Sequence, residues 1–439
     1  MSIYQYEAAF AAGDRTTPAM RNALKQWQEL YYGADASREQ DPCQRIGYTV
    51  VNKLVRTVFG EYQARCEDPV SDRIIQEMNR VSREAVQLAL MLGACFVKPC
   101  VSANGFHFAL IPRSNVLIFG RNAAGDVTDV GMVERTTDAQ YYYTLLERRS
   151  VDEAGFLTIT NRLYRSRNGQ DLGSPVPLAA CPVYRELAEE YRYTEPVGSV
   201  GLVQMRTPML NCVDGSADAV AIYAAAAGLI RNIDRNEAQM NGEFSRGQSR
   251  IIASADLLAR DAAGTLALTG DLFVGLDEDP EQVGLTVFSP SLREQSFLAR
   301  KQEYLRNVES LIGLKRGLLS KADAEQKTAT EIASSAGDFN LTVIDFQRMW
   351  QMCLEQTLVL CAQLAKLYRM EVPQDLQVQI DWGNGTLYDE DRTWQDYRQM
   401  VLDGMLRPEI ALGWRFGLPA EDEQQRQKIR ERLMPETAQ

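Results

Sequence analysis

A long stretch without proline constrains this chain more than any other feature of its sequence. No proline occurs between Pro290 and Pro373, and proline is the residue that most reliably interrupts a helix. Apolar residues recur at helical spacing on both sides of the segment 313–327. The sequence therefore predicts two long helices joined by a loop.

Local signals mark the ends of these two helices. Ser291 and Glu294 have the spacing of a capping box, in which each side chain satisfies a backbone donor of the other residue. Thr328 and Glu331 repeat this pattern, and Gly313 follows the last apolar residue of the first helix. We therefore expect the helices to begin at the two capping boxes and the first helix to end at the glycine.

The loop between the helices is basic. Its candidate functional residues are Gly313, Leu314, Lys315, Arg316, Gly317, Lys321 and Lys327. Asp323 and Glu325 offset part of this positive charge. Local sequence alone favours a solvated connection between helices, and the alternative is a loop with a functional partner.

Length and charge limit the classes of protein to which the chain can belong. The chain has 439 residues, of which 45% are hydrophobic and 24% charged, as expected for a folded protein of two to four domains. The formal net charge is −12, which disfavours tight sequence-independent DNA binding because such binding depends on phosphate neutralisation. A protein that lets DNA pass without holding it firmly is compatible with this charge.

The sequence also argues against secretion, membrane spanning and disulfide formation. The first residues lack a basic start followed by an apolar core, and no run of about 18 apolar residues occurs. None of the eight cysteines forms a Cys-x-x-Cys pair. We expect free thiols in a reducing compartment.

The order of the other predicted elements indicates an α+β fold. Helices are expected at 17–32, 45–62, 72–78 and 82–92, and strands at 94–101, 106–111, 116–119, 127–136, 141–148 and 156–165. A long irregular segment, 170–213, follows these strands. It leads into a predicted helix over 214–244.

A small unit then precedes the proline-free stretch. Short strands are expected at 251–253, 272–275 and 285–288, and an acidic turn between the last two contains Asp277, Glu278, Asp279 and Glu281. After the second long helix, we expect a strand at 376–381 and short helices at 391–404, 409–413 and 420–433.

The sequence offers few candidate catalytic groups. His107 is the one histidine, and the alternating pattern of its strand predicts that it points away from Phe106 and Phe108. No phosphate-binding loop is present, and we expect no cofactor and no metal site. A structural or assembly protein is therefore favoured over an enzyme, although a metal-dependent hydrolase that uses Asp389 and Asp391 remains an alternative.

Several segments together resemble a known family. They are Trp27–Tyr32, 46–59, Ala89–Lys98, the helix–β–helix order of 214–312, Lys327-Thr-Ala-Thr-Glu-Ile332 and Gly404–Ile410. In order and in local sequence, the chain resembles the portal proteins of tailed, siphophage-type bacteriophages and prophages. These proteins form the ring through which DNA enters and leaves the phage head.

The resemblance implies a portal fold with long stem and wing helices, an antiparallel sheet in the wing, a small clip that contains β-strands and a helical crown. The implied parts are an N-terminal wing (1–213), a first stem helix (214–246), a clip (247–290), a second stem helix (291–312), a tunnel loop (313–327), a long wing helix with a returning strand (328–385) and crown helices (386–439).

The resemblance also implies function and partners. It implies a homo-oligomeric ring, usually a dodecamer, with double-stranded DNA in a central channel lined by the tunnel loop, and no enzymatic activity. The terminase large subunit and later a head-completion adaptor would dock on the clip. Major capsid and scaffolding proteins would contact the wing, in a virion assembled in the host cytoplasm. Another phage connector or baseplate protein is the structural alternative.

Overall fold

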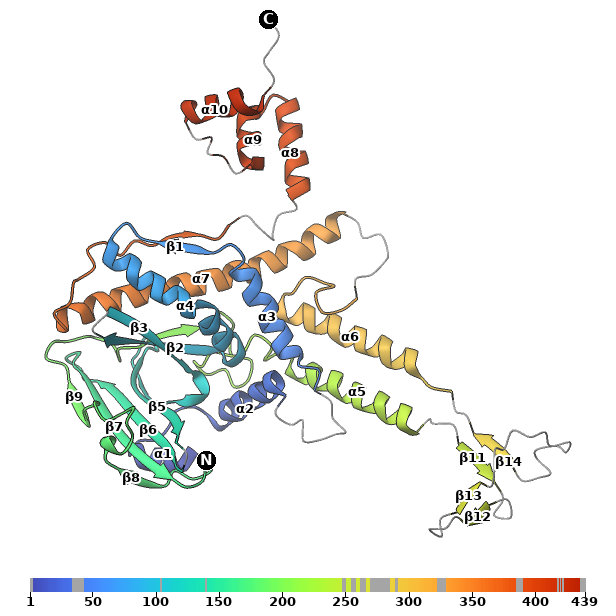
Figure 1. Ribbon diagram of the computed structural model, residues 1–439, viewed down its shortest axis with the longest axis horizontal. Helices are drawn as coiled ribbons and strands as arrows, with labels where there is room; N and C mark the ends of the chain where they lie inside the picture. Colours follow the sequence, from blue (N-terminus) through green and yellow to red (C-terminus); the bar gives the residue numbers. More distant parts are fainter. Residues whose placement is uncertain are drawn as a thin grey trace, which may run out of the picture. The chain divides into compact units, whose positions relative to one another are not determined.

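The computed structural model shows two compact units that combine helices with antiparallel sheets (Figure 1), so the predicted α+β class is confirmed. The larger unit contains Met1–Val55 and Cys66–Gln377, and the smaller one contains Arg56–Arg65 and Val378–Gln439. The structure describes residues 3–33, 43–102, 105–138, 140–246, 250–253, 258–260, 266–268, 285–288, 291–321, 329–383, 390–416, 418, 420 and 422–434.

Among the described residues, four helices precede the first long strand. They are α1 (Ile3–Phe10), α2 (Pro18–Tyr32), α3 (Ile46–Val58) and α4 (Pro69–Leu92). The predicted start of α2 is confirmed, because the Thr17 side chain accepts a hydrogen bond from the backbone N–H of Met20. The two helices expected at 72–78 and 82–92 are one continuous helix, since the residues between them include neither glycine nor proline.

The predicted strands form two antiparallel sheets. A three-stranded sheet has the order β10-β2-β3, from Val203–Arg206, Ala94–Ser102 and Gly105–Pro112. A six-stranded sheet contains β4 (Val116–Arg121), β5 (Val127–Thr137), β6 (Tyr142–Val151), β7 (Leu157–Ser166), β8 (Ser174–Val176) and β9 (Glu190–Arg192). The six long strands were all predicted, whereas β8, β9 and β10 lie in the segment expected to be irregular.

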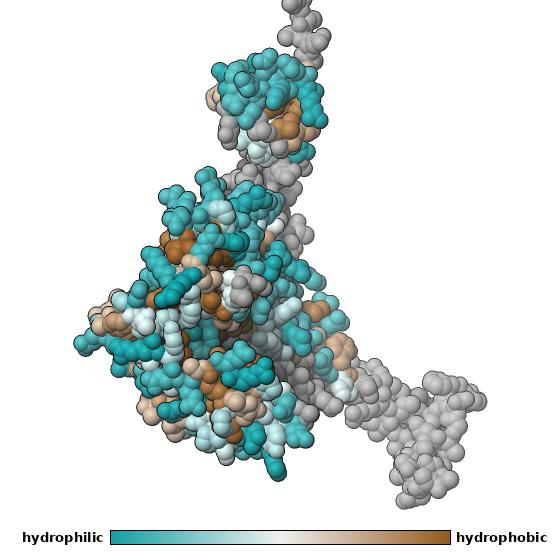
Figure 2. All heavy atoms as spheres, turned by 60° about the vertical axis from the view of Figure 1, so that its left-hand side comes forward, coloured by the Kyte–Doolittle hydropathy of each residue, from teal (hydrophilic) through white to brown (hydrophobic). Residues whose placement is uncertain are grey.

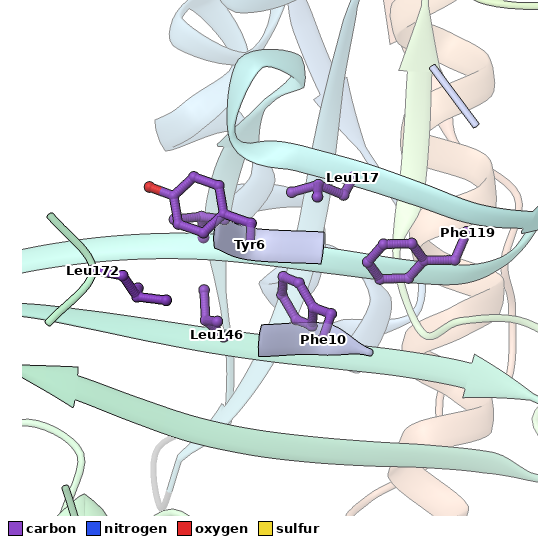
Figure 3. Close-up of a cluster of buried hydrophobic side chains, with 7 residues drawn as sticks. Tyr6, Phe10, Leu117, Phe119, Leu146 and Leu172 are labelled. Atoms are coloured by element: carbon purple, nitrogen blue, oxygen red, sulfur yellow. The ribbon is translucent and has the colours of Figure 1, made fainter. Parts of the chain in front are cut away.

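Helix α1 packs on the six-stranded sheet (Figure 3). Its Tyr6 and Phe10 contact a buried cluster with Leu117, Phe119 and Leu146 from β4 and β6. The rings of Phe10 and Phe119 have centroids 5.2 Å apart. The N-terminal segment is therefore part of the core of the larger unit.

The helix predicted over 214–244 begins thirteen residues later than expected, as α5 (Ala227–Arg246). The preceding residues 219–223 are buried without being helical. Their backbone groups bond to other elements: Ile222 donates to the carbonyl of Leu90 (2.9 Å), and the carbonyl of Val220 accepts from the Thr207 hydroxyl (2.8 Å). These bonds replace the intrahelical bonds that a helix would require.

Helices α5 and α6 (Glu294–Ile312) lie side by side (Figure 1) and antiparallel. Lys301 forms an ion pair with Glu237 (2.8 Å), and farther along α5 the carboxylate of Glu243 binds Arg293 (2.8 Å). The capping box predicted at Ser291 is wrong, because Arg293 is the N-cap residue and has no side-chain cap. Glu243 instead accepts the backbone N–H of Arg293.

The second long helix of the proline-free stretch is α7 (Ala329–Leu367), with 39 residues. Its apolar stripe is buried as predicted from Phe339 to Leu364, and Trp350 is fully buried. Tyr368, just after the last residue of α7, is 43% exposed. Thr328 and its capping box lie outside the described residues. Helix α7 contacts α4, β2 and β10.

Short strands lie between α5 and α6 in the chain. β11 (Arg250–Ala253) pairs with β14 (Leu285–Phe288), and β12 (Leu258–Arg260) pairs with β13 (Leu266–Leu268), both antiparallel. The strands predicted at 251–253 and 285–288 are confirmed. The one predicted at 272–275 lies outside the described residues.

The described residues of the smaller unit form one two-stranded sheet and three C-terminal helices. β1 (Gln63–Arg65) pairs with β15 (Gln379–Asp381), and the tilted rings of Trp382 and Tyr62 pack with centroids 4.9 Å apart. The predicted C-terminal helices are present as α8 (Glu390–Leu402), α9 (Pro408–Phe416) and α10 (Glu423–Leu433).

Candidate functional site

The candidate loop begins with a tight helix end. Gly313 has a left-handed backbone with φ of +76°, as expected for a C-terminal glycine. The next N–H, of Leu314, donates to the carbonyl of Glu309 (2.8 Å), and the Leu314 side chain is buried. The chain therefore leaves α6 in a defined direction.

The first half of the loop folds around the carboxylate of Glu309, which is fully buried. One oxygen accepts the backbone N–H groups of Leu319 (2.5 Å) and Ser320 (2.8 Å). The other accepts the N–H of Gly317 (3.3 Å) and the Ser320 hydroxyl (2.8 Å). Residues 317–320 thus form a turn that encloses a carboxylate.

Three other side chains hold the same segment. Lys53 of α3 donates to the carbonyl of Leu318 (2.7 Å), and the Gln302 side chain accepts the N–H of Lys321 (2.7 Å). Thr342 of α7 donates to the carbonyl of Gly313 (3.2 Å). Residues 313–321 are consequently tied to three helices of the same protomer.

Lys315 and Arg316 lie at the exposed tip of this turn. Both side chains are exposed, as are Gly317 and Lys321. Within the part of the chain that the structure describes, neither Lys315 nor Arg316 forms an ion pair or a side-chain hydrogen bond. The structure thus joins two adjacent positive charges to a backbone of fixed shape.

Other predicted site residues cannot be compared with this turn. Lys327 of the loop lies outside the described residues, as do the four acidic residues Asp277, Glu278, Asp279 and Glu281. Asp389, one of the two carboxylates of the hydrolase alternative, also lies outside them. Among the described residues, no group of three or more histidine, cysteine or acidic side chains could hold a metal ion.

Sequence reasoning missed Glu309, Lys53 and Gln302. A signal for Glu309 exists, because this carboxylate falls on the apolar face of α6 beside Val308 and Ile312, both of which are buried. A charged residue on a buried helix face needs polar partners, and such partners lie close by in the loop that follows α6.

A second feature is a groove of about 910 Å³ along α7. One wall is the α7 face that includes Met352 and Val359, which are 57% and 47% exposed. Residues 197–206 and Pro208 form much of the other wall. Figure 2 shows one face of the molecule, on which hydrophobic residues form separate patches within a mainly hydrophilic surface.

The histidine and the cysteines, all within the described part of the chain, do not form a reactive site. His107 is exposed, whereas Phe106 and Phe108 on either side of it are buried, as predicted. None of the eight cysteines, all of which lie among the described residues, forms a disulfide. Burial raises the pKa of Cys353 to about 12 and also raises the pKa of Cys95 and Cys361, so these thiols stay protonated at neutral pH.

The comparison with protein families decides between the structural and enzymatic interpretations. A model of the family described as phage portal protein, SPP1 Gp6-like, matches residues 74–434, which is most of the chain. The chain belongs to this phage portal protein family. Portal proteins are structural components of the phage capsid and not enzymes, so the hydrolase alternative is set aside.

Two further findings accompany the family assignment. No curated protein matches the portal chain. Among its described helices, none combines the length and the apolar character that crossing a bilayer requires.

Proposed function

We propose that this portal protein forms a closed ring, a dodecamer, at one vertex of the capsid, through which double-stranded DNA is packaged and ejected. The observation that carries the proposal is the family match over residues 74–434. The exposed Lys315 and Arg316, presented on an anchored turn, support a role of this loop at the channel wall.

In this proposal the described elements divide into the parts of a portal subunit. Helices α5 and α6 are the stem, and β11 to β14 belong to the clip between them. Helix α7 and the two larger sheets form the wing, and α8 to α10 form the crown. The apolar groove along α7 meets a neighbouring subunit, because its exposed Met352 and Val359 would be covered there.

The charge of the protein suits DNA passage. A strongly basic wall would hold the phosphates and stall the DNA, whereas a chain with net charge −12 has no such general affinity. A ring of Lys315 and Arg316 side chains would contact phosphates weakly and reversibly, since exposed charges are screened by salt.

The proposed partners follow from the ring. The terminase large subunit supplies ATP hydrolysis and docks on the clip, where Asp277, Glu278, Asp279 and Glu281 are the candidate contacts. A head-completion adaptor takes the same place after packaging. Major capsid and scaffolding proteins contact the wing, and assembly takes place in the host bacterial cytoplasm.

Ring formation is the first test. We expect the purified protein to assemble into a particle of about a dozen subunits, with a central hole in negative-stain images. Native mass measurement gives the number of subunits. Assembled particles without a central hole would contradict the channel and favour another connector or baseplate role.

The second test removes the two exposed charges of the turn. We expect Lys315→Ala combined with Arg316→Ala to leave ring assembly intact and to weaken contact with DNA. Two exposed ion pairs of about 0.2–1 kcal/mol each correspond to about a two- to thirtyfold loss for each contacting subunit. The measurement is the amount of DNA packaged and retained per head.

A matched control removes two exposed lysines from other helices, as Lys25→Ala combined with Lys366→Ala. This control loses the same charge and should retain DNA normally. If the loop variant and the control are both indistinguishable from the wild-type protein in packaging and retention, the loop has no role in the channel.

A further inference from the structure

Glu309 holds both flanks of the Lys315–Arg316 pair. On the side toward α6, its backbone carbonyl accepts the N–H of Leu314 (2.8 Å). On the other side, its carboxylate accepts the N–H of Gly317 (3.3 Å). The two basic residues therefore lie between Leu314 and Gly317, whose N–H groups both donate to Glu309.

The carboxylate and the turn depend on each other. Glu309 is fully buried, and a buried carboxylate is costly unless hydrogen bonds replace its hydration. The donors come from the turn: three backbone N–H groups and the Ser320 hydroxyl. Hydrogen bonds to an ionised acceptor are about twice as strong as neutral ones. A turn without these bonds would leave both the charge and the N–H groups unsatisfied.

A neutral connection between two helices would need no such group. The neighbouring positions on the buried face of α6 are apolar, with Leu305, Val308 and Ile312 all buried. A leucine at position 309 would fit this face better than a charge, but it would not hold the turn. The placement of a carboxylate here indicates that the shape of residues 314–320 matters.

We propose that Glu309 is a positioning residue, which fixes the direction in which Lys315 and Arg316 are presented. This inference rests on the proposed function only for its consequence at DNA. Its structural part, that the carboxylate of Glu309 orders the basic turn, stands independently. Lys53 and Gln302 hold residues 318 and 321, beyond the pair, and are secondary to it.

The structural part is tested by amide hydrogen exchange on the full-length assembled protein. In Glu309→Gln, the side-chain amide keeps one acceptor oxygen and places an N–H₂ group against backbone donors. We expect the amides of Gly317, Leu319 and Ser320 to exchange about tenfold faster or more. The control is Glu303→Gln on the exposed face of the same helix, which should leave these amides unchanged.

Glu309→Ala is the second variant, and it removes all four acceptor bonds. It should accelerate exchange further at the same three amides. The amides of α5, and those of α6 where it packs against α5, should stay protected. Unchanged exchange at these amides in the folded Glu309→Gln protein overturns the inference. Equal acceleration throughout α6 and α7 also overturns it, because it would indicate general destabilisation.

The consequence at DNA is tested with a double-mutant cycle. If Glu309 acts through the basic pair, Glu309→Gln lowers DNA retention in the wild-type background. It adds no further loss when Lys315→Ala and Arg316→Ala are already present. A purely structural role would add the same loss in both backgrounds and would contradict positioning.

The two sets of measurements separate the possible failures. If exchange accelerates as expected but the Lys315→Ala and Arg316→Ala variant packages DNA normally, the proposed function of the loop fails and the ordering role of Glu309 stands. If exchange does not change, the positioning inference fails whatever the DNA measurements give.

Discussion

Asp218→Ala is expected to lower the free energy of unfolding of the larger unit by about 3–5 kcal/mol, because it leaves a buried guanidinium without its counter-charge. The side chain of Arg113 is 1% exposed, and both carboxylate oxygens of Asp218 lie 3.3 Å from its Nη2 atom. Burial lowers the pKa of Arg113, and Asp218 opposes this effect. Arg121 also binds Asp218 (2.8 Å).

The loss extends beyond one pair, since Arg113 joins three parts of the chain. It donates to the carbonyl of Val116 (2.9 Å) in β4 and to the hydroxyl of Thr16 (2.7 Å) in the segment before α2. A displaced Arg113 would therefore weaken the attachment of the N-terminal segment as well as the contact with Asp218.

The measurement is denaturant unfolding followed by the fluorescence of the buried tryptophans Trp27 and Trp350. The control is Glu371→Ala, which removes an ion pair with Arg73 (2.7 Å), whose two side chains are 72% and 68% exposed. The control should change stability by less than about 1 kcal/mol. Equal losses for both variants would show that burial of the pair has no special effect.

The strands could be predicted because their signals are local. Most of the long strands end at a turn that contains glycine or asparagine, such as Asn122–Gly125. Strands β2 and β3 pair as an antiparallel hairpin, in which Ser102 lies opposite Gly105. The start of α2 at Thr17 depends on a few neighbouring residues and was predicted equally well.

The interactions that were missed join residues far apart in the chain. Tyr6 and Phe10 pack on strands more than a hundred residues later, and Lys53 binds the carbonyl of Leu318. Neither contact has a local pattern. In the candidate site, the basic residues could be selected from their charge, whereas the Glu309 turn depends on how residues 317–320 return to α6.

Gly93→Ala is expected to destabilise the larger unit by about 2–5 kcal/mol. Gly93 has φ of +84°, and a side chain in a left-handed conformation costs about 1–2 kcal/mol. In addition, a Cβ atom would lie 2.2 Å from the carbonyl oxygen of Ala219 and 2.7 Å from the nitrogen of Val220. Overpacking against a backbone adds about 1–3 kcal/mol.

Gly125→Ala separates these two contributions. Gly125 has almost the same φ, +87°, but a Cβ atom there would meet nothing within 4 Å. It should therefore cost only the backbone strain, and denaturant unfolding of both variants measures the difference. Equal losses would contradict a role for the close approach at Gly93.

The same close approach explains why the helix predicted from residue 214 starts only at Ala227. Gly93 follows the last residue of α4 and caps the end of that helix. In the structure it also gives space to residues 219 and 220, whose backbone crosses directly over it. Thr207 donates to the Gly93 carbonyl (2.9 Å) and to that of Val220, so three segments meet at this glycine. The alanine-rich sequence of residues 219–226 favours a helix, but their packing against the end of α4 holds the first of them in a non-helical backbone. Gly93→Ala should disrupt this packing.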